Sequence, residues 1–326
     1  MIGYHASHEQ SGPRELLECV RLAQRAGFGA AMCSDHLFPW LSTHRDGVAF
    51  AYAWLGAALE ATTLPFGVVS APGQRYHPVV LAQAASTLEQ MYPGRFWLAV
   101  GSGEALNEHV TGDSWPDKPA REARLHECVD VMRRLWRGET VDHAGLVRVR
   151  RARVYSSGVD TAVPLFAAAV TPETAQWAAG WADGLVTING PVERMRRVVE
   201  AFRASGGRDK PVRLQYHLSW ALSREQARAQ AWDQWRHAGL RYPMSWDLAM
   251  PEDFDAACVS VEVDDLVDAV AMESDLDWHA ARLQEAAELG FDQILLHNVG
   301  RNQREFIEVF GESVLPRLVG GTVRVE

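Results

Sequence analysis

Short apolar runs of strand length alternate with amphipathic helical patterns along the whole chain. Leu16, Val20 and Ala23 give one such helix an apolar face, and Gly27 is typical of a helix end before the next run. The apolar runs fall at 2–6, 30–34, 65–71, 96–101, 164–170, 184–188, 212–221 and 292–297. Eight strands with helical crossovers predict the α/β class and a parallel (β/α)8 TIM barrel.

Two segments exceed what a barrel of about 250 residues needs. They fall at about 138–160 and 240–275. The first alternates like a small hairpin, and the second, rich in Trp, Met and Pro, favours a lid over the strand ends. We therefore expect residues 1–326 to form a single elaborated barrel domain.

Composition indicates which binding partners and which cellular compartment to expect. A net charge of −10 argues against nucleic acid or an anionic membrane as the main partner. No basic leader precedes the first strand, and the longest apolar stretch, 48–59, is too short to span a bilayer. Four widely spaced cysteines without a C-x-x-C motif favour reduced core thiols and a cytoplasmic protein. These cysteines are Cys19, Cys33, Cys128 and Cys258.

Polar residues cluster where the predicted strands end. Asp35, His36 and Trp40 follow the second strand, and a glycine-flanked turn presents Ser102 and Glu104 after the fourth. Ligand sites in parallel α/β proteins form at the carboxyl ends of strands, so these side chains predict an active-site rim.

Each of these residues also has a purely structural interpretation. A lone strand histidine is more often a satisfied core residue, Asp35 could cap a helix, and Glu104 could be a solvated acid at a helix start. Trp40 could simply pack. Several polar groups meeting at one rim are harder to explain by packing alone.

Four motifs together carry a family resemblance. They are Ser34-Asp35-His36 with Pro39-Trp40, then Arg75-Tyr76-His77-Pro78, the run Gly101 to Glu108, and the run His297 to Gln303. The chain resembles the luciferase-like flavin oxidoreductase superfamily, and within it the glucose-6-phosphate dehydrogenases that use the deazaflavin coenzyme F-420. The resemblance implies a barrel, usually a homodimer, that holds a flavin or deazaflavin over the strand ends. It also implies a non-proline cis peptide at about Val68–Val69.

The resemblance further implies site roles. His36 would take a hydroxyl proton from a small-molecule substrate, Glu104 would protonate or polarise the ring, and Trp40 would cover the reacting centre. Hydride leaves a carbinol carbon readily only if its O–H proton departs too, which suits a histidine base. Asp35 would contact the ring edge. The other implied cofactor contacts are Val68, Val69, Ala71, Ser102, Gly103, Asn107, Ala169, Val170, Thr171 and Asn189.

The chain departs from the sugar-phosphate enzymes at their phosphate contacts. Val170-Thr171 replaces a Gly-Gly pair, Pro191 replaces a phosphate-binding lysine, and a second such lysine has no counterpart. A dianionic sugar phosphate would be poorly paired, so glucose 6-phosphate is not the expected substrate. The changed residues at the expected binding site of the cofactor phosphate favour FMN over F-420, and hence an FMN-dependent oxidoreductase. The alternative is an F-420-dependent dehydrogenase of a sugar or alcohol.

Two other classes stay open. Histidines near strand ends, at His5, His36, His217 and His297, would suit a metal-dependent hydrolase, although no His-x-His motif or bridging lysine supports a metal, and we expect none. A non-catalytic flavin-binding barrel is the other. The aromatics Trp235, Tyr242, Trp246 and Trp278 suggest either a partly hydrophobic ligand or packing in a lid or dimer surface.

Overall fold

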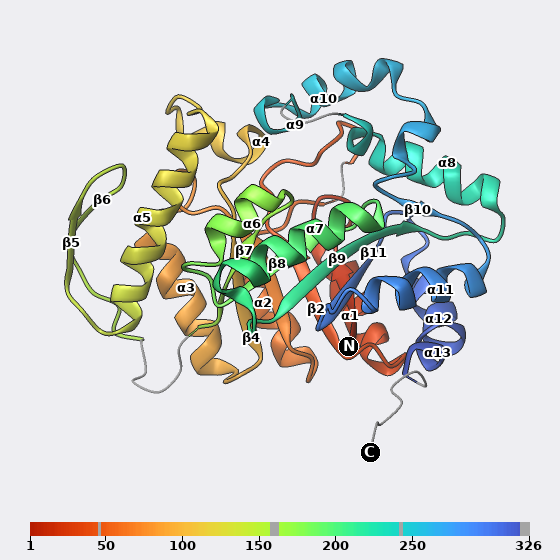
Figure 1. The fold of residues 1–326 in the computed structure, drawn as a ribbon, viewed down its shortest axis with the longest axis horizontal. Coiled ribbons are helices and arrows are strands. Elements are labelled where there is room, and N and C mark those ends of the chain that lie inside the picture. Colours follow the sequence, from red (N-terminus) through yellow and green to blue (C-terminus); the bar gives the residue numbers. More distant parts are fainter. Residues whose placement is uncertain (45–46, 157–162, 241–243, 320–326) are drawn as a thin grey trace.

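A closed parallel barrel forms the centre of the computed structural model, which describes residues 1–44, 47–156, 163–240 and 244–319 (Figure 1). Neighbouring strands pair in the order β1-β2-β3-β4-β7-β8-β9-β11, and β11 pairs back with β1. Each strand overlaps one predicted apolar run, so the predicted barrel is confirmed. The strands are β1 (Ile2–Ala6), β2 (Ala30–Ser34), β3 (Phe66–Ser70), β4 (Phe96–Val100), β7 (Leu165–Ala168), β8 (Gly184–Ile188), β9 (Val212–Ser219) and β11 (Gln293–Asn298).

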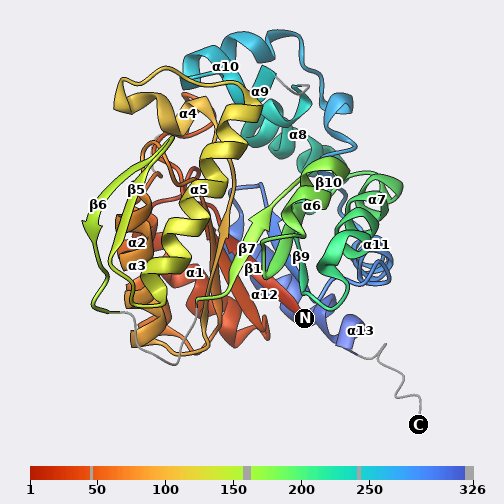
Figure 2. The same ribbon diagram turned by 60° about the vertical axis from the view of Figure 1, so that its left-hand side comes forward.

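Helices surround the barrel on its outer face (Figures 1 and 2). In the first of them, Leu16, Val20 and Ala23 are buried against the strands, and Gly27 follows with φ 95°, a conformation that only glycine adopts easily. The main helices are α1 (Pro13–Arg25), α2 (Ala51–Ala61), α3 (Pro78–Met91), α5 (Lys118–Trp136), α6 (Pro172–Ala178), α7 (Val192–Phe202), α8 (Arg224–Trp235), α11 (Leu276–Ala287), α12 (Gln303–Ser313) and α13 (Leu315–Val319).

Both predicted insertions are additions to the barrel. In the first, β5 (Val141–Ala144) and β6 (Arg148–Ala152) pair antiparallel, which confirms the hairpin; residues 157–160 lie outside the described residues. The second contains α9 (Met244–Asp247), α10 (Pro251–Ala257) and β10 (Ala271–Met272), which pairs with β9, whereas 241–243 are not described. Figures 1 and 2 place α9 and α10 beside α8 and the short α4 (Ala105–Glu108).

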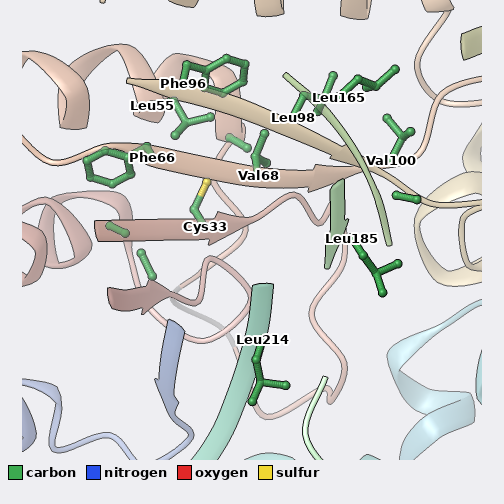
Figure 3. Close-up of a cluster of buried hydrophobic side chains, with 14 of the residues drawn as sticks. Cys33, Leu55, Phe66, Val68, Phe96, Leu98, Val100, Leu165, Leu185 and Leu214 are labelled. Carbon is green, nitrogen blue, oxygen red and sulfur yellow. The ribbon is translucent and has the colours of Figure 1, made fainter. Parts of the chain in front are cut away.

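Alternation along the strands divides the core into two parts. One set of side chains, including Phe66, Val68 and Leu98, packs between the sheet and the helices (Figure 3). The other set fills the barrel interior, where the Arg213 guanidinium lies 4.2 Å from the ring centre of Trp97 and 4.1 Å from that of Phe166. Each of these three residues is the second of its strand, so the stack lies toward the amino-terminal ends of the strands.

The chain contains no helix, within the described ranges, that is long and apolar enough to cross a membrane. All four cysteines are buried and free, in agreement with the predicted core thiols.

Gly67 makes room for this interior stack, and we expect Gly67→Ala to destabilise the fold. A Cβ there would lie 1.8 Å from Trp97 Cζ2, so a core ring must shift, at a cost of about 1–3 kcal/mol or more. Urea unfolding measures the change. Gly56→Ala is the matched control, because its Cβ meets nothing within 4 Å on α2 and should leave stability unchanged or raise it by up to about 1 kcal/mol. Equal midpoints for the two variants would contradict this packing.

Candidate active site

A cavity of about 380 Å³ opens at the carboxyl ends of the barrel strands. Its wall comes from the segments that follow β2, β3, β4, β7 and β8, together with part of the second insertion. All but one of the predicted site residues line this cavity, which confirms that they meet at one rim. They are Asp35, His36, Trp40, Val69, Ala71, Ser102, Gly103, Glu104, Asn107, Ala169, Val170, Thr171 and Asn189.

Val68 is the exception. Its side chain is fully buried in the core outside the barrel, beside Cys33 and Phe66 in Figure 3, whereas the neighbouring Val69 side chain faces the interior. Successive side chains of a strand point to opposite faces, so both could not line the same cavity. The Val68 side chain therefore faces away from the cavity, and the cofactor contact that the resemblance implies at the Val68–Val69 peptide stays a prediction.

His36 is half-buried and is held through one ring nitrogen. Its Nδ1 lies 3.2 Å from the carbonyl oxygen of Phe38 and 3.3 Å from Nδ2 of Asn107. Asn107 in turn accepts hydrogen bonds from the backbone N–H groups of Leu37 and Phe38, so α4 fixes this loop. Among the described residues Nε2 of His36 has no partner, which leaves it available to a ligand in the cavity.

Glu104 precedes α4 and also lines the cavity. Desolvation raises the pKa of its carboxyl group to about 7, and the nearby charges of Glu9 and Glu108 act in the same direction. Within the described part of the chain, no side-chain or backbone group forms a hydrogen bond with the side-chain carboxyl group of Glu104. A carboxyl group poised near neutrality can hold or release a proton at a bound ligand.

The Asp35 carboxylate is fully occupied by protein groups. It accepts hydrogen bonds from Ser70 Oγ at 2.5 Å and Tyr76 Oη at 3.0 Å, and Oδ1 lies 3.2 Å from Arg75 Nη2. Arg75 also pairs with Glu108, whose carboxylate accepts the Arg75 backbone N–H at 2.7 Å. Asp35 therefore borders the cavity but its charge serves to join the ends of β2 and β3 to α4.

Trp40 connects the rim to the second insertion. Its ring centre lies 4.9 Å from that of His36 and stacks on His237 at 4.5 Å with an interplanar angle of 10°. Phe254 of α10 meets it edge-on at 5.3 Å. Trp40 thus both packs and borders the cavity, so the two sequence interpretations describe the same side chain.

The segments after β7 and β8 close the far wall. Thr171 precedes α6, where its hydroxyl oxygen accepts the N–H of Thr174 and donates to the Thr174 hydroxyl. Both ends of the Asn189 side-chain amide bond to the backbone of His217 in β9. Asn189 therefore fixes the wall, and the Thr171 hydroxyl is already engaged.

Three of the four histidines that the sequence placed near strand ends form a buried cluster, of which His36 is not a member. Ring centres of His5 and His297 are 4.6 Å apart, and those of His217 and His297 are 5.2 Å apart. Burial lowers the pKa of all three, to about 3 for His5 and about 4 for His217. No group of three or more potential metal ligands is arranged to hold an ion in the part of the chain that the structure describes.

Two residues that sequence patterns did not single out contribute to the site. Glu9 is buried after β1, and although burial alone would raise its pKa, His36, His5 and a hydrogen bond from Ser34 lower it to about 2. His237, in the short segment between α8 and the second insertion, lines the cavity. Neither carried a sequence signal, because Glu9 resembles a loop acid and His237 belongs to no motif that the sequence analysis singled out.

Comparisons with known proteins identify the family. The family model described as luciferase-like monooxygenase matches residues 2–293. The chain belongs to the luciferase-like monooxygenase family. This confirms the resemblance drawn from the motifs.

Luciferase-like relatives cover nearly the full chain. The F-420-dependent glucose-6-phosphate dehydrogenases of Mycobacterium avium (strain 104) and of Microbacterium testaceum (strain StLB037) are 34% and 33% identical, over 97% of both chains in each case. A solved structure of an F-420-dependent secondary alcohol dehydrogenase with an F-420–acetone adduct superposes with a TM-score of 0.88 at 29% identity, covering 98% of both chains. This luciferase-like chain is therefore similar to flavin or deazaflavin oxidoreductases throughout its length.

We expect Glu104→Gln to flatten the pH dependence of stability. Between about pH 4.5 and pH 7 the folded protein retains a proton on Glu104 that the unfolded chain releases, so the free energy of unfolding falls as pH rises through this window. Because Glu104 is partly exposed, we expect the free energy of unfolding to fall by about 1–2 kcal/mol over this pH range. Urea unfolding at about pH 4 and pH 8 measures the difference, with exposed Glu305→Gln as control. The same fall in wild type and Glu104→Gln would contradict the raised pKa.

Proposed function

We propose that this protein is an F-420-dependent dehydrogenase that transfers hydride between the deazaflavin and the carbinol carbon of an alcohol or sugar. The observation that carries the proposal is that two groups line the same cavity. One is His36, whose Nε2 has no partner among the described residues, and the other is the Glu104 carboxyl group, whose pKa is about 7. His36 is suited to accept the hydroxyl proton of the substrate, and Glu104 is suited to stabilise negative charge that develops at the edge of the cofactor ring.

The cavity fits a planar heteroaromatic ring. Its volume of about 380 Å³ is in the range of cofactor sites. Gly103 adopts φ 85°, and a Cβ there would lie 3.1 Å from Glu108 Cγ and 3.3 Å from Ala71 Cβ, so glycine lets the turn after β4 pack closely in the cavity wall. Val69, Ala169 and Val170 give the ring an apolar bed.

F-420 supplies a hydride acceptor when it is bound, and the chain supplies the proton chemistry around it. His36 accepts the substrate hydroxyl proton at Nε2 in the tautomer whose Nδ1–H donates to the carbonyl oxygen of Phe38. The ionised Glu9 stabilises the imidazolium that results. Trp40 excludes water from the reacting centre.

The relatives favour F-420 over FMN, which the sequence had favoured. Eight relatives at 32–34% identity carry F-420 in their names, and so does the alcohol dehydrogenase structure. Structures with FMN in their titles are 15–17% identical, a level that supports the fold alone. Val170-Thr171 changes the cradle without excluding the longer coenzyme. The homodimer, the cytoplasmic location and the cis peptide at Val68–Val69 stay predictions.

Cofactor titration and a base-deletion variant test this function. We expect F-420 to bind at least tenfold more tightly than FMN, as measured by quenching of cofactor fluorescence. His36→Ala should lower kcat for alcohol-dependent F-420 reduction by about 10²–10⁴-fold, because the proton acceptor is lost, and should change the F-420 Kd by less than about threefold.

His126→Ala is the matched control, since His126 is exposed on α5 and does not line the cavity. It should leave both kcat and Kd unchanged. Tighter binding of FMN than of F-420 would overturn the cofactor assignment, and an unchanged kcat in His36→Ala would overturn the catalytic role.

A further inference from the structure

Arg194 is a cationic side chain of the cavity that has no acidic partner. It lines the cavity from the first turn of α7, which follows β8. Among the described residues its side chain makes one hydrogen bond, from Nη2 to the carbonyl oxygen of Asn189 at 2.8 Å. A guanidinium carries several N–H donors and a permanent positive charge, so Arg194 keeps both donors and charge for a ligand.

The other arginine and lysine side chains that line the cavity form ion pairs. These pairs are Arg75–Asp35 at 3.2 Å, Lys118–Glu122 at 3.5 Å and Arg121–Asp247 at 3.8 Å. Within the described ranges, Arg194 is therefore the cavity cation that remains for an anionic group of a ligand.

The backbone at Gly190 holds the Arg194 guanidinium in place. A Cβ at residue 190 would lie 2.1 Å from Arg194 Nη2 and 2.5 Å from its Cζ, so the guanidinium lies directly against the glycine. Asn189, which accepts the Nη2 hydrogen bond, is itself fixed, because both ends of its side-chain amide bond to the backbone of His217. Arg194 thus has a defined position in the cavity wall.

Arg194 lies across the mouth of the barrel from His36. His36 follows β2 and Arg194 follows β8, and three strands separate β2 from β8 in either direction around the barrel. The residues proposed to support the cofactor ring, Val69, Ala169 and Val170, belong to β3 and to the segment after β7, which lie on one of these two arcs. A substrate on the opposite side of the ring can therefore contact His36 at one end and Arg194 at the other.

A single fixed guanidinium is suited to a carboxylate. The two planar groups form parallel N–H···O hydrogen bonds, and their charges cancel. A phosphate dianion would bring a second negative charge, which no other cavity cation of the described ranges is free to pair. A substrate without an anionic group would leave the guanidinium unpaired at the cavity.

We propose that the substrate is a hydroxy acid whose carboxylate binds Arg194 while its carbinol lies at His36. The inference rests on the proposed function and deepens it by naming the substrate class. The carbinol C–H bond breaks and its hydride passes to F-420, the hydroxyl proton passes to His36, and the product is the corresponding oxo acid. Because the two anchors lie on opposite sides of the mouth, several carbon atoms separate the carbinol from the carboxylate.

Hydroxy acids and their uncharged amides, matched in length, test this substrate class. The acids are 3-hydroxybutyrate, 5-hydroxyhexanoate and 7-hydroxyoctanoate, each compared with its amide in an F-420 reduction assay. We expect kcat/KM for the best acid to exceed that for its amide by about tenfold or more. Arg194→Gln should raise KM for that acid about tenfold, change kcat by less than about threefold and leave the amide unaffected, because only the charge pair is lost.

Two further variants separate the position of the guanidinium from its charge. Gly190→Ala keeps the charge but displaces the guanidinium, so the preference for the acid should fall as it does in Arg194→Gln. Arg197→Gln is the matched control, because it removes an exposed positive charge from the same helix outside the cavity lining, and it should change no parameter. Loss of the preference in Arg197→Gln, or its retention in Gly190→Ala, would overturn the assignment to a fixed Arg194 site.

The F-420 dissociation constant, measured by fluorescence quenching in every variant, separates substrate from coenzyme as the partner of Arg194. A large rise in that constant in Arg194→Gln, with the acid preference retained, would assign the arginine to an anionic group of the coenzyme and overturn the inference.

Two further results would overturn the substrate class while F-420 binding and His36-dependent turnover persist. One is equal kcat/KM for each acid and its amide in the wild-type protein, and the other is a higher kcat/KM for glucose 6-phosphate than for any of the hydroxy acids. Failure to bind F-420, or to reduce it with any alcohol, would overturn the proposed function and this inference together.

Discussion

A buried ion pair between Arg75 and Asp35 organises the site on which the account depends. Three strand-end segments meet there, because Asp35 follows β2, Arg75 follows β3, and Glu108 on α4 takes the other side of the guanidinium. Removing one partner would leave an uncompensated buried charge, at a cost of about 3–5 kcal/mol. The pair sets the position of the reactive groups, since His36 is adjacent to Asp35 and Asn107 is adjacent to Glu108.

Charges around His36 and Glu104 are arranged for opposite proton roles. Attraction to His36 and His5 helps to hold the pKa of Glu9 at about 2, whereas desolvation and neighbouring carboxylates favour the neutral form of Glu104. One cavity thus holds a group suited to accept a proton and a group suited to hold one. The barrel supplies this arrangement through strand ends, and Trp235 and His237, which come before the second insertion, complete the cavity lining.

Much of this arrangement could be predicted from the sequence. Apolar runs and helix stops such as Gly27 specified the barrel, and residues that follow strands, such as His36 and Glu104, were placed at the rim by topology alone. The hairpin at 141–152 was predicted from alternation. These features depend on local patterns and on the single closed arrangement that eight parallel strands adopt.

Other features depend on contacts between distant segments, which no local pattern encodes. The direction of the Val68 side chain follows from the strand register, and the engagement of Asp35 by Ser70, Tyr76 and Arg75 follows from how two strand ends meet. His237 enters the site because the segment that follows α8 returns to the rim of the barrel. The sequence favoured FMN because of two residues after β7, Val170 and Thr171. The relatives that favour F-420 match nearly the whole chain and are therefore stronger evidence.

The most direct test follows the hydrogen that leaves the substrate. The protein would be mixed with F-420 and an alcohol bearing deuterium on its carbinol carbon, and the reduced coenzyme analysed by mass spectrometry and NMR. The account predicts one deuterium on the ring carbon that accepts hydride, with the hydroxyl proton passing to His36. Reduced coenzyme that carries only solvent hydrogen at that carbon would contradict direct hydride transfer in this cavity.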